Sequence, residues 1–95
     1  MVDTDDGLFL WDAANEEHVE RHGVSREEAE EVLLSPDRQQ LARRVVDGEV
    51  RWPVVGSSQS GRFMVVVYTM RAGRMRVVTA RSADEKEKRR WRRRK

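Results

Sequence analysis

The sequence predicts a single α+β domain in which two N-terminal helices pack on a four-stranded antiparallel sheet and a basic helix follows. Three observations predict this fold. Capping signals bracket two helical segments before residue 36, β-branched runs separated by turn residues fill residues 41 to 82, and a further capping signal opens the C-terminal segment. The 95 residues are the length of one small domain, so we expect a single domain over residues 1–95.

Both N-terminal helices have start and stop signals. Asp12 can cap a first helix in WDAANEEHVERHG, and Gly23 can end it in a left-handed backbone conformation. Ser25 and Glu28 have the spacing of a capping box for a second helix, which runs to about Leu34 because Ser35-Pro36 stops it. The helical period predicts that the first helix buries a polar stripe, with Val19 at its edge: Trp11, Ala14, Asn15, His18 and His22.

Four β-branched runs follow, at residues 41–46, 50–56, 62–70 and 74–82. Asp47-Gly48, GSSQSG and Ala72-Gly73 separate them, which predicts an antiparallel meander. The third run has apolar residues at both odd and even positions and is typical of a central strand covered on both faces, whereas Pro53 indicates an edge or a bulge in the second run. Strict alternation along the fourth run places Arg74, Arg76 and Ala80 on one face, and Val77, Thr79 and Arg81 on the other.

The last helix is predicted from Ser82 and Glu85, which have the spacing of another capping box. Trp91 is almost the only apolar residue of this segment, EKEKRRWRRRK. Its cations and its indole could bind backbone phosphate and stack on a base, so we expect Arg89, Arg90 and Trp91 to contact nucleic acid. The alternative is a solvated helix supported by its own ion pairs.

Composition excludes several classes of function. The chain has no cysteine, which rules out disulfides, thiolate zinc sites and cysteine nucleophiles. The acidic start MVDTDDGLFLW lacks the features of a signal peptide, and no apolar run is long enough for a membrane helix, so we expect a cytoplasmic protein without membrane contact.

The charges are strongly divided along the chain. Residues 1–49 contain 5 Lys/Arg and 14 Asp/Glu, a net charge of −9, whereas residues 50–95 contain 14 and 3, a net charge of +11. A basic half of this kind is typical of a protein that binds a polyanion, with nucleic acid as the leading partner. The alternative is that the two halves neutralise each other within the fold.

The two histidines, His18 and His22, lie one helical turn apart. Such a pair can bind a metal or transfer protons, but the sequence HVERH lacks the glutamate of the zinc-peptidase motif HExxH, so we expect no metal site. His22 beside Gly23 also suits a purely structural position at the helix end. Both interpretations, structural and substrate-contacting, remain open at this point.

Arginines form the second set of candidates, because guanidinium groups hold phosphates and stabilise a transferring phosphoryl group. Arg76 and Arg81 lie on the fourth run with Arg74, and Arg51 and Arg62 lie on neighbouring runs. The alternative is an ordinary solvated strand face.

Four blocks, in order, resemble the BrnT family of small toxins. They are WD..N..H...HGVS.EEAEEVL at residues 11–33, DGE.RW...G at 47–56, GR..VVVYT at 61–69 and R.RVVTAR.A...E.RRW at 74–91. The most specific parts are the HGVS turn into a capped acidic helix and the VVTAR strand that leads to a basic helix. The likeness covers nearly the whole chain.

The resemblance implies a RelE-like ribonuclease fold and the toxin half of a type II toxin–antitoxin pair. It implies cleavage of RNA, without metal or cofactor, by activation of a ribose 2′-hydroxyl against the adjacent phosphate. The expected partners are the RNA substrate and a small cognate antitoxin, of ribbon-helix-helix type, that forms a DNA-binding autoregulatory complex. The rival hypothesis is a binding module without turnover, either a decayed toxin or a DNA-binding partner.

Residues at the matching positions become the candidates for the site: Asn15, His18, His22, Arg51, Arg62, Arg76, Arg81, Glu87 and Arg90. Among them we expect Arg51, Arg76 and Arg81 to bind the scissile phosphate, and His18 or His22 to transfer a proton. Trp91 stands where many relatives have tyrosine, so no phenol can act as an acid or base at this position.

Overall fold

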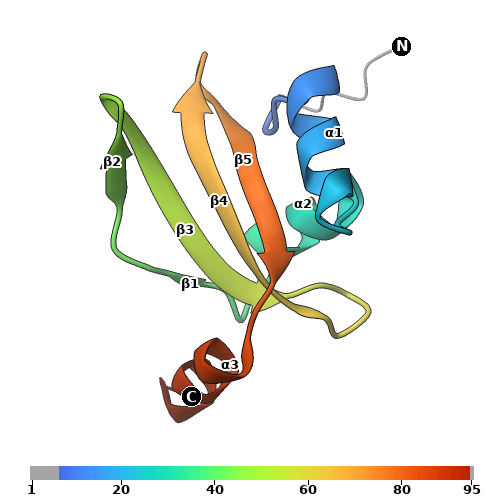
Figure 1. Cartoon of the computed structure of the whole chain (residues 1–95), viewed down its shortest axis with the longest axis vertical. Coiled ribbons are helices and arrows are strands. Elements are labelled where there is room, and N and C mark those ends of the chain that lie inside the picture. Colours follow the sequence, from blue (N-terminus) through green and yellow to red (C-terminus); the bar gives the residue numbers. More distant parts are fainter. Residues whose placement is uncertain (1–6, 95) are drawn as a thin grey trace.

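The computed structural model describes residues 7–94 (Figure 1). The elements follow in this order: α1 (Ala13–Arg21), α2 (Arg26–Leu34), β1 (Gln39–Gln40), β2 (Arg44–Val46), β3 (Glu49–Ser57), β4 (Phe63–Arg71), β5 (Arg74–Ser82) and α3 (Glu85–Arg94). This order confirms the predicted α+β fold. The acidic start of the chain, residues 1–6, which we compared with a signal peptide, lies outside the described residues.

All neighbouring strands are antiparallel, in the order β1-β3-β4-β5, and β2 also pairs with β3. The apolar strand β4 lies between β3 and β5, as predicted. The prediction of one strand over residues 41–46 was wrong, because β1 ends at Gln40 and the chain rejoins β3 only at Arg44. Pro53 lies opposite this gap and has no N–H to donate, while its carbonyl accepts from the Leu41 backbone at 2.9 Å. The proline therefore marks a break in the partner strand at the sheet edge.

Two tight turns join β2 to β3 and β4 to β5. Asp47 and Gly48 have φ values of 51° and 79°, and Ala72 and Gly73 have 55° and 74°. Positive φ at both central residues is the geometry of the type I′ hairpin turn, whose twist matches that of the flanking strands. Both predicted turns are confirmed.

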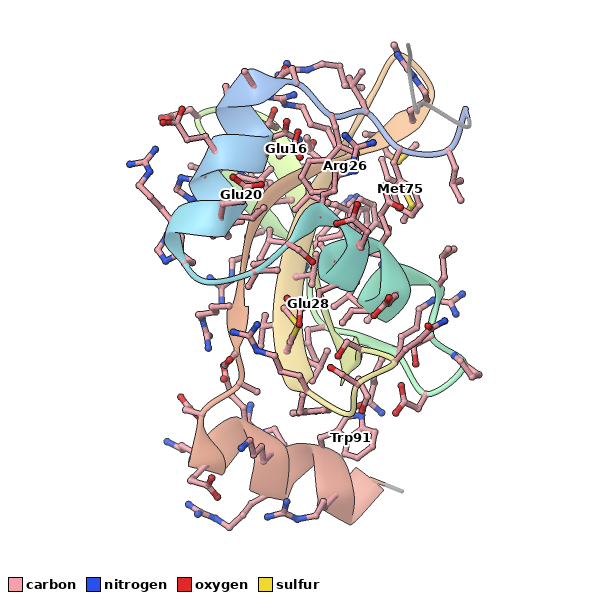
Figure 2. All side chains as sticks on the ribbon, turned by 90° about the vertical axis from the view of Figure 1, so that its right-hand side faces the viewer. Glu16, Glu20, Arg26, Glu28, Met75 and Trp91 are labelled. Atoms are coloured by element: carbon pink, nitrogen blue, oxygen red, sulfur yellow. The ribbon has the colours of Figure 1, made fainter. Side chains whose placement is uncertain are left out.

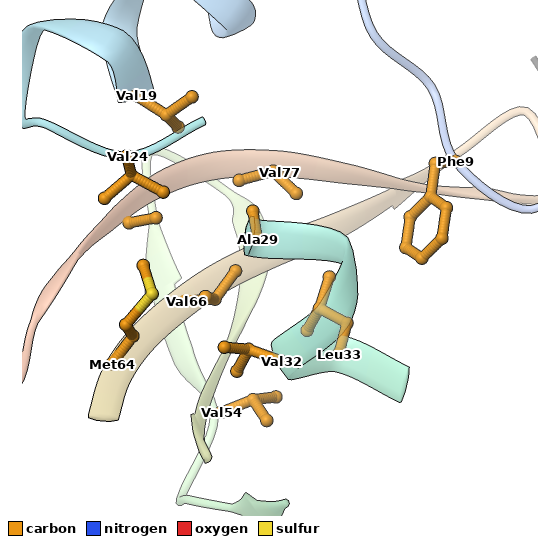
Figure 3. Packing of buried hydrophobic residues seen from close by; sticks show 11 residues of the cluster. Phe9, Val19, Val24, Ala29, Val32, Leu33, Val54, Met64, Val66 and Val77 are labelled. Carbon is orange, nitrogen blue, oxygen red and sulfur yellow. The ribbon is translucent and has the colours of Figure 1, made fainter. Parts of the chain in front are cut away.

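The main core lies on the face of the sheet that α1 and α2 cover (Figure 3). Val54, Val66 and Val77 point from three adjacent strands toward Val19 of α1 and Val32 of α2. We call this side of the sheet the helix face. Where α1 meets α2, Arg26 lies 3.6 Å from Glu16 (Figure 2). Its guanidinium lies over the Trp11 ring, 5.6 Å from the ring centroid.

A smaller cluster lies on the opposite face and attaches α3 to one end of the sheet. Val55, Val65 and Ala83 are buried there, and the Trp91 ring packs against Phe63 with 4.6 Å between ring centroids. Figure 1 shows α3 at the far end of the sheet from α1. The apolar residue of the basic helix is thus half-buried by the sheet.

The first two helices begin where the sequence predicts. Asp12 and Ser25 form reciprocal capping boxes with Asn15 and Glu28. The predicted cap of the last helix was wrong: Asp84 and Glu87 exchange backbone-to-side-chain hydrogen bonds of 2.8 Å in each direction. Ser82 cannot cap α3 because it is still paired with Met64 in the sheet.

The predicted inward stripe of α1 was partly wrong. Asn15 and Val19 are buried, but Ala14 and His22 are exposed. Val19 is the one branched apolar side chain of α1, so its burial sets the rotation of the helix. The Asn15 amide then lies at the sheet edge, where its Nδ2 donates to the carbonyls of Leu10 and Val77 at 3.1 Å each. His22 follows the last helical residue and therefore lies beyond the packed face.

In the part of the chain that the structure describes, no helix has the length and apolar character needed to cross a membrane.

Candidate active site

A β-bulge brings the candidate arginines to one face of the sheet. Tyr68 pairs with Val77, but Val67 pairs with Thr79, so Val78 is an extra residue in β5. Directly paired residues share a face, and side chains alternate along each strand. The extra residue therefore reverses the alternation beyond Val78, and the prediction that Arg76 and Arg81 point to opposite faces was wrong.

The register defines this second face. Thr69 is paired with Arg76, and Val65 is paired with both Val55 and Arg81. Alternation along β3 adds the third arginine to the same side. We call this side the arginine face, and its members include Arg51, Val55, Val65, Thr69, Arg76 and Arg81.

A groove of about 640 Å³ lies between α1 and the upper part of the arginine face. Of the predicted site residues, it brings together Asn15, His18, Arg51 and Arg76. The remaining side chains of its wall include residues that the sequence analysis did not select: Ala14, Glu49, Thr69 and Arg71. Glu49 directly precedes the predicted strand at residues 50–56, and its i, i+2 spacing from Arg51 could have identified it as a neighbour of the site.

Arg76 is held by the start of α1. Its Nη1 donates to Asp12 Oδ2 at 2.7 Å, while Asp12 Oδ1 accepts from the Asn15 backbone at 3.1 Å. The hydrogen bond from Arg76 and the one from the Asn15 backbone lower the pKa of the Asp12 carboxyl. Only 15% of the Arg76 side chain is exposed. The guanidinium is thus paired and fixed in position at the wall of the groove.

Arg51 is held within its own strand. Its Nε donates to Glu49 Oε1 at 3.0 Å, and the other oxygen of Glu49 lies 3.7 Å from Arg71 Nη2. Buried Thr69 lies beneath them and donates its hydroxyl to the Val50 carbonyl at 2.7 Å. One carboxylate therefore positions two guanidinium groups beside the groove.

The two histidines differ in position. His18 is half-buried and lines the groove, whereas His22 is exposed and is not among the lining residues. Their rings meet edge to face, with 4.9 Å between centroids. Within residues 7–94, no cluster of three or more His, Cys, Asp or Glu is suited to hold a metal ion. The structure thus brings one histidine to the arginines and leaves the other at the helix end.

Arg62 lies elsewhere and ties separate elements together. Its Nη1 donates to the Gly23 carbonyl at 2.7 Å and to Glu28 at 3.1 Å, and its Nε donates to Ser82 Oγ at 3.0 Å. This guanidinium connects the α1–α2 turn to the end of β5. These contacts indicate that Arg62 has a structural role, and it does not line the groove.

Arg81 and Glu87 form a bidentate pair at the lower end of the arginine face, with N–O distances of 2.9 and 2.7 Å. The hydrogen bonds from Arg81 lower the pKa of Glu87 to about 2, and the same bonds raise the pKa of Arg81. On α3, Arg89 and Arg90 are exposed, and Trp91 packs on the sheet. Arg74 is half-buried at the other end of β5.

A further groove of about 530 Å³ runs along α2 and has an opposite character. Its charged lining side chains are all acidic: Glu27, Glu30, Glu31 and Asp37. Carboxylates repel phosphate at neutral pH, so this groove does not suit an RNA backbone. The arginine-lined groove is the candidate active site.

A family model described as the ribonuclease toxin BrnT of type II toxin–antitoxin systems matches residues 11–87. No curated protein matches the chain significantly. The matched range includes both N-terminal helices, the whole sheet and the first turn of α3.

Proposed function

We propose that this chain, which belongs to the BrnT family of ribonuclease toxins of type II toxin–antitoxin systems, is an active endoribonuclease that cleaves RNA in the groove beside α1. The observation that carries the proposal is that Arg51, Arg76 and His18 line one groove. Two guanidinium groups and an imidazole supply the phosphate binding and the proton transfer that RNA cleavage requires.

The reaction is an internal transfer at phosphorus. A ribose 2′-oxygen attacks the adjacent phosphorus while His18 accepts the proton of the 2′-hydroxyl. The bond from phosphorus to the 5′-oxygen breaks, that oxygen takes a proton from water, and the other fragment retains a 2′,3′-cyclic phosphate. Arg51 and Arg76 stabilise the negative charge that builds up on the non-bridging oxygens.

Carboxylates position these arginines before RNA binds. Asp12 and Glu49 each accept a hydrogen bond from one guanidinium and leave other N–H groups of the same fork to face a phosphate. An arginine that is already oriented loses less conformational entropy on binding. Asp12 and Glu49 are therefore positioning residues, and they do not react themselves.

A ribonuclease toxin of a type II system has a cognate antitoxin, and its substrate is RNA. The finer features of the partner remain our proposals from the family: a small ribbon-helix-helix antitoxin that forms a DNA-binding complex with the toxin. Because the substrate is RNA, we propose that the protein acts in the cytoplasm. Coexpression with the product of the neighbouring reading frame should abolish toxicity and yield a copurifying complex.

Cleavage by the purified protein tests the proposal directly. Wild type should produce fragments that end in 2′,3′-cyclic phosphate, and cleavage should persist in EDTA because the groove supplies both the positive charge and the proton acceptor. Arg51→Ala, with its fold checked by circular dichroism, should cleave about 100-fold more slowly or worse, the usual cost of losing one oriented donor to a transition state. If folded wild type binds RNA without cutting it, the rival binding module is correct.

A further inference from the structure

A second cationic pocket lies at the edge of the sheet, where the chain leaves the ladder between β1 and β2. Its volume is about 440 Å³. Arg43 and Arg44 line it from the strand edge, Pro53 lines it from β3, and Arg90 reaches it from α3. Three guanidinium-bearing residues from two separate parts of the chain thus surround one concavity.

These arginines differ from those described above in their lack of acidic partners. Arg51, Arg62, Arg76 and Arg81 each pair with a carboxylate. Across residues 7–94, none of the three pocket arginines forms an ion pair with Asp or Glu.

The other groups near these three arginines balance little of their positive charge. Arg43 lies over the Trp52 ring at 5.9 Å, and the charge of Arg90 is the weakest of the causes that lower the pKa of Glu87. The pocket therefore carries positive charge that the protein itself leaves largely unbalanced.

The register adds a second, independent observation. Arg44 is directly paired with Arg51 across β2 and β3, so the two side chains share a face. Like charges directly opposite each other destabilise a sheet. Glu49 is bonded to Arg51 and leaves Arg44 without a counter-charge. A polyanion that lies across both residues would remove this repulsion.

The same pairing makes the two cationic regions continuous. Arg51 lines the candidate active site, Arg44 lies beside it, and Arg44 also lines the edge pocket. A strand that is held at Arg51 can therefore pass over Arg44 into the edge pocket.

We propose that Arg43, Arg44 and Arg90 form a second RNA subsite, which binds the backbone phosphates of the strand that flanks the cleaved linkage. This inference rests on the proposed function, because the groove beside α1 defines where the cleaved linkage lies. An acidic protein segment is the competing occupant. RNA is favoured because the pocket continues the surface on which the scissile phosphate is bound.

Binding can be measured separately from cleavage. The probe is a fluorescein-labelled 12-nucleotide RNA of mixed sequence with 2′-O-methyl groups throughout, which lacks the attacking hydroxyl and cannot be cut by the proposed reaction. Fluorescence anisotropy at 50 to 400 mM salt gives the affinity and its salt dependence for wild type and for the triple variant Arg43→Gln, Arg44→Gln and Arg90→Gln. Glutamine keeps part of the aliphatic stem and a polar end, and it removes the charge.

The triple variant should show a shallower dependence on salt. Each phosphate contact to a single strand contributes about 0.7 to the slope of log K against log salt, so the loss of three contacts should reduce the slope by about 2. At 0.1 M salt the same change weakens binding by about 100-fold, provided that the affinities converge near 1 M. The melting temperature should change little, because removing Arg44 relieves its repulsion with Arg51 and this offsets the loss of the contact between Arg43 and the Trp52 ring.

A charge-matched control distinguishes a subsite from a general effect of net charge. The control variant replaces three cationic residues outside both cationic pockets by glutamine: Arg21, Arg38 and Lys86. It loses as many positive charges as the first triple variant. This control should bind the RNA with nearly the wild-type slope. Equal losses in the two triple variants, or an unchanged slope in the first, would overturn the proposal.

Two further readouts complete the test. If a polyglutamate peptide binds through Arg43, Arg44 and Arg90 and the RNA does not, the partner is an acidic protein and the proposal is wrong. Cleavage of a dinucleotide, which is too short to reach the edge pocket, should be unchanged in the triple variant. A failure of the proposed function would appear instead as no dinucleotide cleavage by wild type, while the binding result would still stand on its own.

Discussion

The two ends of β5 carry the same kind of contact and differ in what surrounds it. At one end Arg76 donates to Asp12, the N-cap of α1. At the other end Arg81 donates to Glu87, in the first turn of α3. In both places an arginine of the arginine face is bound to an acidic residue at the start of a helix, where a negative charge also complements the helix dipole.

The two pairs differ in how many nitrogens of each guanidinium are bound to the carboxylate. Glu87 engages two nitrogens of Arg81 with both of its oxygens, whereas Asp12 accepts a single hydrogen bond from Arg76. Arg76 also lines a groove that contains His18, and Arg81 is not among the lining residues. We infer that the Arg76 pair orients a guanidinium for substrate, while the Arg81 pair fastens α3 to the sheet. Two ion pairs of the same kind can therefore have different roles, one functional and one structural, according to what surrounds them.

The largest expected effect is that of Arg76→Ala, with Arg81→Ala as its matched control. Both variants remove one arginine of β5 and one ion pair. We expect Arg76→Ala to lower the single-turnover cleavage rate by about 10²- to 10³-fold, the usual cost of losing one oriented donor to a developing negative charge. Arg81→Ala should retain most of the rate and mainly lower the melting temperature.

Single-turnover rates and thermal melts of the two variants measure this difference. Equal loss of cleavage in both, with both folded, would return Arg81 to the catalytic set that the sequence predicts. Loss of cleavage in Arg81→Ala alone would show that Arg81, and not Arg76, acts on the substrate.

The next effect concerns the histidines, which are one turn apart in sequence but differ in position. His18→Ala should reduce cleavage by about 100-fold, the lower end of what a general base contributes. The sequence places His22 on the buried stripe of the helix, but the side chain is exposed, so only its helix-end position and its ring contact with His18 remain to be lost in His22→Ala. A change within about 0.5 kcal/mol is expected there.

Cleavage rates and urea unfolding of both histidine variants test this order. The assignment of His18 would fail if His22→Ala lost cleavage while His18→Ala kept it. Such a result would show that the exposed ring reaches the substrate from the helix end.

A smaller effect, on stability, is expected for Asn15. Its amide oxygen accepts from the Asp12 backbone at 2.7 Å, and its Nδ2 bridges the Leu10 and Val77 carbonyls. Asn15→Ala leaves these groups without their partner and should cost about 2 kcal/mol, typical of buried polar groups left unsatisfied. For a domain of this size, that is a fall of about 10 °C in the melting temperature. Calorimetry measures it, and a melting temperature equal to that of wild type would refute it.

The smallest effect is the acid dependence that Glu87 causes. Its pKa is about 2 in the folded chain and has an ordinary value of 4.5. The unfolded chain therefore binds more protons between these values, so this contribution is complete above pH 4.5 and is lost as the pH falls toward 2. Glu87→Gln should show a shallower loss of stability over this range. An unchanged slope in urea melts at pH 2.5 to 5 would contradict the strength of the Arg81 pair.

Local signals in the sequence determined most of the elements. Asp12, Ser25 and the Asp47-Gly48 and Ala72-Gly73 turns act within a few residues of themselves, so the capped helices and hairpins could be predicted from spacing alone. The chain also belongs to the family that its sequence blocks resemble. The two helix starts and the two turns form as predicted because their hydrogen bonds are local.

Features that depend on pairing between distant segments could not be predicted in this way. The bulge at Val78 arises from the match of β5 to β4, and it moves Arg81 to the side of Arg76. The end of β5 at Ser82 likewise shifts the cap of α3 to Asp84. One extra residue in a ladder reverses every side chain beyond it, and no local pattern in RMRVVTARS marks which residue is extra.

The rotation of α1 about its axis is the other feature that is set by tertiary packing. The sequence by itself determined where this helix begins and ends, and it placed His18 and His22 on the same stripe. Burial of Val19 against the sheet, together with the Asn15 hydrogen bonds to backbone carbonyls, turned one histidine toward the arginines and left the other in solvent. A helix with a weak apolar stripe has several rotations of similar energy, and only the surface that it packs against selects one of them.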